Sequence, residues 1–183
     1  MTFVKADKGT TNNKNDKCMT PPKIAEQLCM LLPVKMLDAC LDPFMGEGAF
    51  YRFLPSLNTD WCEIDKGRDF FEYKKKVDWI ISNPPYSIFD TVLDHSFEIA
   101  DNVAYLVPLS KVFSSMGRIR KWQKYGNIKR IWILSASKCG FPFGFPCAFV
   151  WWQKDYRGAT KIIEHKDWRC ERLEQAQRQQ MLF

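Results

Sequence analysis

Residues 36–50, MLDACLDPFMGEGAF, decide the fold of this chain. The stretch starts with a short apolar run that stops at Asp42, and such a run predicts a buried strand. A turn containing Gly46 and Gly48 follows. Because glycine has no Cβ, backbone at these two positions can come close to a ligand. A helix is then expected to begin over residues 49–54.

The acidic residue beside this turn limits the kind of ligand. A carboxylate at Asp42 would repel a phosphate group but would attract an ammonium group. The turn therefore favours a cationic amino-acid ligand over the pyrophosphate of a dinucleotide. An ordinary connection between a strand and a helix, without a ligand, is the alternative.

Helical and strand-like patterns alternate along the chain. Apolar residues recur at helical spacing at residues 23–32 and 87–100, and we expect a basic helix at 114–125 and a polar helix rich in Gln and Arg at 167–181. Strand-like runs occur at residues 61–64, 77–82, 103–107, 128–134 and 148–152. This alternation predicts an α/β sheet with helices on both faces. We expect a flexible basic segment over residues 1–17, one folded domain over 18–154 and a helical tail over 155–183.

Polar side chains follow three of the predicted strands at the point where each one ends. They are Asp42, Glu63 and Asn83. In open α/β sheets ligands bind beyond the carboxyl ends of the strands, so these side chains should gather along one rim. A carboxylate at Glu63 could accept hydrogen bonds from both hydroxyls of a ribose.

The tetrapeptide Asn83-Pro84-Pro85-Tyr86 comes directly after the apolar strand 77–82. Two consecutive prolines are stiff and lack N–H groups, so the carbonyls of Asn83 and Pro84 can point outward as acceptors. The side-chain oxygen of Asn83 and the carbonyl of Pro84 could then bind both hydrogens of a planar amino group. Tyr86 offers a flat surface for the ring that carries this amine. A purely structural turn is the alternative.

These motifs, in this order, resemble those of class I S-adenosylmethionine-dependent amino-methyltransferases, and most of all the N6-adenine DNA methyltransferases. The resemblance is carried by Thr20-Pro21-Pro22, Asp42-Pro43-Phe44-Met45-Gly46-Glu47-Gly48, Glu63, Asp69-Phe70 and Asn83-Pro84-Pro85-Tyr86. It covers residues 18–154 and implies a single Rossmann-like catalytic domain with a mostly parallel sheet of the seven-stranded type. Ribosomal RNA base methyltransferases and protein glutamine methyltransferases share Asn-Pro-Pro-Tyr, so the motifs are less specific for adenine than for methyl transfer.

The resemblance also implies S-adenosylmethionine as the cofactor and assigns a role to each matching residue. The implied cofactor-binding residues are Thr20 and Pro21 at the methionine end, Asp42 at the ammonium, Phe44, Gly46 and Gly48 along the wall, Glu63 at the ribose, and Asp69 and Phe70 at the adenine. The implied catalytic residues, which seat the target base, are Asn83, Pro84, Pro85 and Tyr86. Two acceptors on the target amine would favour a pyramidal nitrogen and free its lone pair for in-line attack, with no metal and no general base.

Two departures from the family pattern lead to further expectations. Only five residues separate Glu63 from Asp69, too few for a crossover helix, so the third strand should be short. The roughly thirty residues after Lys154 are enough for a helix but not for a target-recognition domain. We therefore expect weak or short sequence preference, or recognition supplied by a partner subunit or a homodimer.

Charge is unevenly divided along the chain, whose formal net charge is +6. Residues 102–154 contain nine Lys and Arg and no Asp or Glu, which leaves 18 basic and 21 acidic residues elsewhere. A basic segment interleaved with aromatic residues suits a polyanion with stacked bases, and DNA is the favoured partner. The candidate nucleic-acid-binding residues are Lys111, Arg118, Arg120, Lys121, Lys124, Phe141 and Phe143. A solvated basic face that keeps the protein soluble is the alternative, as is core packing for the two Phe residues.

The composition supports one domain that contains a large core. The chain has 183 residues, 46% of them hydrophobic, with no apolar run long enough to span a membrane and no apolar segment near the N-terminus, so we expect a cytoplasmic protein. Its seven cysteines form no CxxC pair, which argues against a zinc site and against a disulfide framework. Besides adenine N6 in DNA, two functions stay open: methylation of an RNA base or a glutamine, and a non-catalytic nucleic-acid-binding partner subunit.

Overall fold

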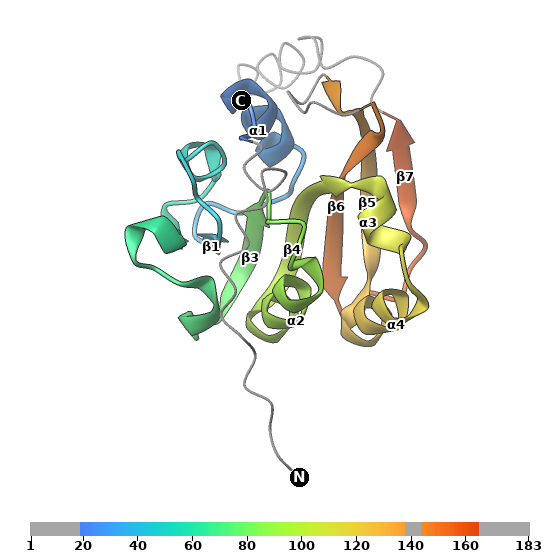
Figure 1. The fold of residues 1–183 in the computed structure, drawn as a ribbon. Coiled ribbons are helices and arrows are strands. Elements are labelled where there is room, and N and C mark those ends of the chain that lie inside the picture. The colour runs from blue at the N-terminus through green and yellow to red at the C-terminus, as the bar shows by residue number, and fades with distance from the viewer. Residues whose placement is uncertain (1–18, 138–143, 165–183) are drawn as a thin grey trace, which may run out of the picture.

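A computed structural model describes residues 19–137 and 144–164, which form one seven-stranded sheet in the order β2-β1-β3-β4-β6-β5-β7 (Figure 1). The strands are β1 (Ala39–Asp42), β2 (Asn58–Trp61), β3 (Val77–Ser82), β4 (Ala100–Pro108), β5 (Gly126–Ser135), β6 (Pro146–Lys154) and β7 (Lys161–Glu164). Strand β6 runs antiparallel to β4 and β5, whereas every other neighbouring pair is parallel. The predicted α/β class with a mostly parallel sheet is confirmed.

Helices cover both faces of the sheet, as predicted. In the described part of the chain the α-helices are α1 (Pro22–Met30), α2 (Phe89–Ile99), α3 (Leu109–Phe113) and α4 (Met116–Tyr125). Buried residues of α1 belong to one hydrophobic cluster, and those of α2 and α4 belong to a second cluster on the other face. Figure 1 shows α2 and α4 on the same side of the sheet.

Helix α1 follows from its sequence. Pro22 is its first residue, a position that proline favours because its fixed φ suits a helix and its missing N–H costs nothing there. The carbonyl of Pro21 accepts hydrogen bonds from Ile24 N at 2.9 Å and Ala25 N at 3.1 Å. The residues of α1 that face the sheet are Ile24, Ala25, Leu28 and Cys29, all buried. This packing fixes the residues just before the helix.

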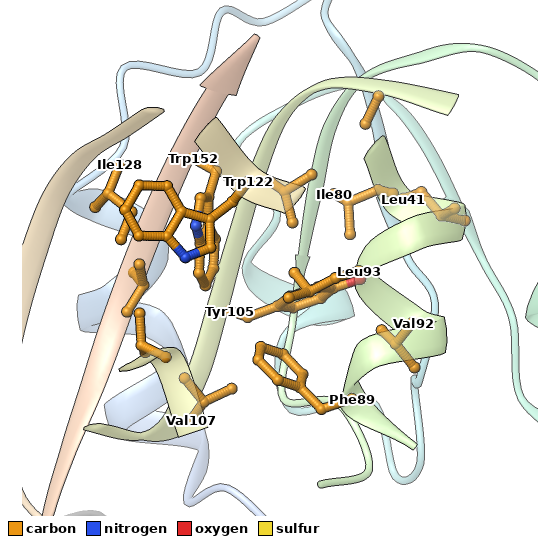
Figure 2. Close-up of a cluster of buried hydrophobic side chains, with 14 of the residues drawn as sticks. Leu41, Ile80, Phe89, Val92, Leu93, Tyr105, Val107, Trp122, Ile128 and Trp152 are labelled. Carbon is orange, nitrogen blue, oxygen red and sulfur yellow. The ribbon is translucent and has the colours of Figure 1, made fainter. Parts of the chain in front are cut away.

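The core beneath α2 is apolar and includes two buried hydroxyl groups that are hydrogen-bonded to each other. Figure 2 shows Phe89, Val92 and Leu93 of α2 close to Tyr105 of β4. The hydroxyl of Tyr105 is within 2.7 Å of the Ser96 hydroxyl, which also lies 2.6 Å from a backbone carbonyl of the same helix. Buried polar groups need such partners, so this pair lets a tyrosine lie at the centre of the sheet.

The predicted helix after the glycine turn is absent. Residues 49–54 contain only the short 3₁₀ helix η2 (Tyr51–Phe53). Pro55 is the reason, because a proline forces the residue before it out of the helical region, and Leu54 has an extended backbone with ψ of 121°. Phe50 instead stacks on Phe149 of β6, with ring centroids 6.3 Å apart.

The expected short third strand is also absent. Residues 62–76 contain the 3₁₀ helices η3 (Ile64–Lys66) and η4 (Phe70–Glu72) and one isolated bridge, and no described strand pairs with the outer edge of β2. Strand β2 itself covers residues 58–61 rather than the predicted 61–64, because its register with β1 pairs Asn58 with Ala39. An edge strand tolerates such polar residues, so apolar patterning misplaced it by three positions.

A strand replaces the first part of the predicted C-terminal helical tail. Strand β7 lies within the range 155–183 and pairs with β5, Ile162 opposite Ile131. The described sheet thus has seven strands because β7 is added beside β5, although the strand expected beyond β2 is missing. The predicted segment 1–17 and the predicted helix 167–181 lie outside the described residues. No helix of the described chain is both long and apolar enough to cross a bilayer.

Candidate active site

Asp42 lies at the carboxyl end of β1 and is almost completely buried, with 1% of its surface exposed. Its Oδ1 accepts hydrogen bonds from Ser82 Oγ at 2.6 Å and from Phe44 N at 3.3 Å. Burial raises the pKa of Asp42 to about 7, although these hydrogen bonds lower it in part. No Lys or Arg of the described residues forms an ion pair with this carboxylate, so it would be stabilised by a cation brought in by a ligand.

The glycine turn has the backbone conformation that its sequence requires. Gly46 and Gly48 have φ values of +51° and +83°, a region that other residues adopt at a cost in free energy. A Cβ at Gly46 would also lie 3.2 Å from the terminal methyl of Met19. The turn therefore needs glycine at both positions, and the segment before α1 packs directly against it.

Glu63 contacts the same turn. Its Oε2 accepts a hydrogen bond from Gly46 N at 2.6 Å, and its Oε1 accepts one from Asp65 N at 3.3 Å. Lys66 adds a hydrogen bond from Nζ to the carbonyl of Gly46, at 2.8 Å. A carboxylate oxygen has two lone pairs, so both oxygens keep acceptor capacity for the hydroxyls of a ligand.

The predicted adenine-binding pair lies close to Phe44. The carboxylate of Asp69 caps η4 by accepting from Phe71 N at 2.9 Å. Phe70 is buried, with its ring centroid 5.2 Å from that of Phe44 and 4.7 Å from that of His95. Phe44 is only half-buried, so its ring is the more accessible aromatic surface at this point.

The tetrapeptide Asn83-Pro84-Pro85-Tyr86 follows β3, as predicted, and it lies next to the glycine turn. Strands β1 and β3 are neighbours, with Leu41 opposite Ile80. Ser82, which precedes Asn83, is fully buried and donates the hydrogen bond to Asp42. This contact links the two motifs across 40 residues of sequence. Sequence reasoning missed Ser82, although a hydroxyl at the end of an apolar strand beside a buried acid was a signal.

The side chain of Asn83 has hydroxyl partners on both sides. Its Nδ2 donates to Thr20 Oγ1 at 3.1 Å, and its Oδ1 accepts from Tyr86 Oη at 2.9 Å. Thr20 is buried, whereas Asn83 and Tyr86 are half-buried. Three segments that lie far apart in the sequence therefore meet at one rim of the sheet. They are the residues just before α1, the residues just after β1 and the residues just after β3.

The basic residues of α4 fall into two groups. Arg118 is buried and donates to both carboxylate oxygens of Asp90, at 2.7 and 2.6 Å, and to Ser114 and the Lys111 carbonyl. Hydrogen bonds from Arg118 hold the pKa of Asp90 below its usual value. Lys121 pairs with Asp94 at 2.6 Å.

Arg118 therefore fastens α4 to α2 and is withdrawn from the candidate nucleic-acid-binding set. Arg120 and Lys124 are exposed, while Lys111 is half-buried. Phe141 and Phe143 lie outside the described residues, so the proposed base contact at these positions stays a prediction.

Comparison with known proteins identifies the fold. No protein-family model matches the chain, and no curated protein matches its sequence. Among solved structures, a candidate class I S-adenosylmethionine-dependent methyltransferase from Listeria monocytogenes has a TM-score of 0.64 at 12% identity, covering 88% of this chain and 70% of that chain. A candidate RNA methyltransferase from Pyrococcus horikoshii has a TM-score of 0.61 at 17% identity, covering 76% and 87%. The M protein of the type I restriction enzyme EcoKI has a TM-score of 0.60 at 12% identity, covering 74% and 44%. The fold is that of class I methyltransferases.

Proposed function

We propose that this protein transfers a methyl group from S-adenosylmethionine to the exocyclic N6 amino group of adenine in DNA. The observation that carries the proposal is the 2.6 Å hydrogen bond from Ser82 to Asp42. It brings a buried carboxylate suited to an ammonium group next to a tetrapeptide suited to an amino group. A methyl donor that is itself an amino acid, and an amine that accepts the methyl, are the two reactants that such a pair of sites would bring together.

The residues present fit the proposed cofactor. Asp42 is a buried carboxylate without a cationic partner among the described residues, and the cofactor would supply an ammonium. Gly46 and Gly48 bring no Cβ to this turn, and Glu63 retains lone pairs for the ribose hydroxyls. Phe44, whose ring packs against that of Phe70, would contact the adenine, and Asp69 would accept from its amino group. When bound, the cofactor supplies a methyl group that its sulfonium has already activated.

The target amine would be bound by acceptors of this chain. Asn83 Oδ1 and the carbonyl of Pro84 accept its two N–H groups, while the ring of Tyr86 lies against the base. These hydrogen bonds favour a pyramidal nitrogen, whose lone pair is then directed at the methyl group. Pro85 keeps the turn rigid, so the acceptors are in place before the base arrives.

The charge distribution supports nucleic acid as the substrate. The segment 102–154 has no acidic residue, and Arg120 and Lys124 expose their side chains on α4. A duplex base must leave its stack to reach a pocket of this kind, whereas a base in a single strand need not. The chain spans 44% of the EcoKI M protein that it resembles in fold. We propose that a partner subunit or a second copy supplies target recognition.

Transfer of tritiated methyl from S-adenosylmethionine to DNA, RNA and protein, followed by nucleoside analysis, tests the function. We expect label in N6-methyladenine from DNA. Asn83→Ala should abolish transfer and leave cofactor affinity within a few-fold of wild type, whereas Asp42→Asn should weaken cofactor binding first. Equal loss of transfer and cofactor binding in Asn83→Ala would contradict the assigned role of Asn83.

Methylation of an RNA base is the second candidate. It is favoured by the fold similarity to the candidate RNA methyltransferase from Pyrococcus horikoshii, 87% of whose chain is covered. Label in RNA but not in DNA would select it, label in glutamine would select a protein substrate, and cofactor binding without transfer to any of the three would indicate a non-catalytic partner.

A further inference from the structure

Thr20 has a single polar side-chain atom, and that atom contacts the catalytic amide. The residue is 5% exposed, so its hydroxyl has little access to water. Thr20 Oγ1 lies 3.1 Å from Asn83 Nδ2, across 63 positions of sequence. Loss of this contact would remove the hydrogen bond that the structure gives to the buried Thr20 hydroxyl, and with it one of the contacts that orient the half-buried Asn83 amide.

The position of Thr20 is fixed by two neighbours in the chain. Met19 packs on Gly46, and the carbonyl of Pro21 caps the first turn of α1. The buried face of α1 in turn packs on the sheet. The position of Thr20 is therefore fixed by packing. Its hydrogen bond with Asn83 restricts the orientation of the Asn83 side chain.

The oxygen of the Asn83 amide is contacted by the hydroxyl of Tyr86, which is less buried than Thr20. Tyr86 Oη binds Asn83 Oδ1 at 2.9 Å, but Tyr86 is half-buried and its ring is the proposed surface for the base. An arriving base would compete with this hydroxyl for Oδ1, the atom that the target amine needs. The contact with Thr20 uses Nδ2 and leaves Oδ1 available, so the target amine does not compete for it.

We propose that Thr20 is a positioning residue that holds the plane of the Asn83 amide, so that its oxygen faces the target amine when the base displaces Tyr86 Oη. The sequence motif had assigned Thr20 to the methionine end of the cofactor. In this role its hydroxyl serves the base instead of the cofactor, through the hydrogen bond with Asn83 Nδ2. This role rests on the proposed methyl transfer, and it predicts a loss of kcat rather than of cofactor affinity.

Thr20→Val tests the proposal because valine has nearly the same shape and lacks the hydroxyl. We expect kcat to fall by roughly tenfold to hundredfold, as for other misplaced catalytic groups, while the Kd for the cofactor stays within about threefold. Thr20→Ser keeps the hydroxyl and should restore kcat to near the wild-type value. Ile24→Val is the matched control, because it loosens the packing of α1 without removing the hydrogen bond, and its kcat should equal that of wild type.

A second measurement does not depend on activity. The Asn83 side-chain NH2 group, assigned by its loss in Asn83→Ala, gives a pair of signals in a nitrogen–proton NMR spectrum. The proton that Asn83 Nδ2 donates to Thr20 Oγ1 should exchange with water faster in Thr20→Val than in wild type and in Thr20→Ser. If no substrate is methylated, the proposed function fails while this result still supports the contact between Thr20 and Asn83.

Three outcomes would overturn the positioning role. One is unchanged kcat in Thr20→Val. Another is a rise in the cofactor Kd that matches the loss of kcat, because Thr20 would then bind the cofactor. The third is a rate of exchange of the Asn83 side-chain protons in Thr20→Val that equals the rate in wild type. If Thr20→Val does not fold, Thr20→Ala is measured in the same way, and the same three results apply.

Discussion

Strands β4, β5 and β6 are nine or ten residues long, whereas β1 and β2 have four residues each. In the long-strand half (β4, β5 and β6) the interior is almost wholly apolar, with Phe149 and Trp152 fully buried. The glycine-turn half (β1, β2 and residues 62–76) lacks both a helix after the turn and a third strand. There, hydrogen bonds and ion pairs of charged side chains fix the backbone, as when Arg68 pairs with Asp60 at 2.5 Å.

This difference shows how one domain separates stability from binding. Burial of apolar surface in the long-strand half supplies free energy without any requirement for a particular chemistry. In the proposed function the glycine-turn half keeps carboxylates available for the cofactor, and it uses the same groups, notably Glu63, to order its own backbone. Substitutions in the long-strand half should therefore reduce stability most, whereas substitutions in the glycine-turn half should affect binding.

Phe149→Ala tests the long-strand half. Its ring lies between Trp132, 5.8 Å away, and Phe50, so truncation would leave a cavity. We expect the free energy of unfolding to fall by about 3–5 kcal/mol, measured by chemical denaturation. Ile162→Ala in the exposed edge strand β7 is the control, with an expected change below about 0.5 kcal/mol. Equal effects of the two substitutions would refute this account of the core.

Asp42 should make the glycine-turn half less stable as pH rises. Its folded pKa is about 7 and its ordinary value is 3.8, so the folded state retains a proton that the unfolded state loses between these limits. Stability from this group is therefore full below pH 3.8 and is lost as pH rises through 7. In Asp42→Asn this loss is absent.

The comparison is made without ligand at pH 5 and pH 8. Relative to wild type, Asp42→Asn should gain about 3 kcal/mol of stability between these two pH values, measured by denaturation at each pH. If wild type and Asp42→Asn differ by the same free energy of unfolding at pH 5 and at pH 8, the carboxylate ionises normally in the folded state.

Substitutions at Arg118 and Arg120 should separate stability from the proposed nucleic-acid binding within one helix. Arg118→Met removes the hydrogen bonds to Asp90 and should lower the free energy of unfolding by about 2 kcal/mol. Arg120→Met should leave thermal stability unchanged and weaken DNA binding with a reduced salt dependence. Loss of stability in both variants, or of DNA affinity in Arg118→Met alone, would contradict the division of α4 into two groups.

Glu63→Gln should produce the smallest change in stability. In place of one carboxylate oxygen, the amide would present an N–H group to the N–H of Gly46 or of Asp65, and two donors cannot form a hydrogen bond. We therefore expect the free energy of unfolding of the ligand-free protein to fall by about 1 kcal/mol. Glu47→Gln lies in the same turn but is exposed, so its thermal unfolding should match wild type. An unchanged unfolding temperature in Glu63→Gln would mean that Glu63 serves the ligand alone.

Elements with a strong local pattern were predicted well. The strand over residues 77–82 is predicted correctly because a run that is apolar except for Asp78 and Ser82 is followed closely by two prolines, and both features act locally. The helix expected over residues 49–54 was wrong because Pro55 outweighed the periodicity. Strand β2 was misplaced since its partner β1, rather than its own composition, fixes its register.

The candidate site shows the same division. The residues that carry the motifs were named from sequence, since carboxylates, glycines and the Asn-Pro-Pro turn are recognisable by type and order. The contacts of Ser82 with Asp42 and of Thr20 with Asn83 join positions 40 and 63 residues apart, and no local pattern encodes them. The burial of Arg118 was missed for the same reason, because its partner lies on another helix.

The order of motifs and the alternation of apolar runs determined the class of fold, because hydrogen bonding and burial impose periodicities that each segment carries within itself. Folding in three dimensions set the partner of each polar side chain, the pKa of Asp42 and the edge at which the seventh strand was added. These depend on distances between segments remote in sequence, which become defined only when the sheet brings the strand ends together.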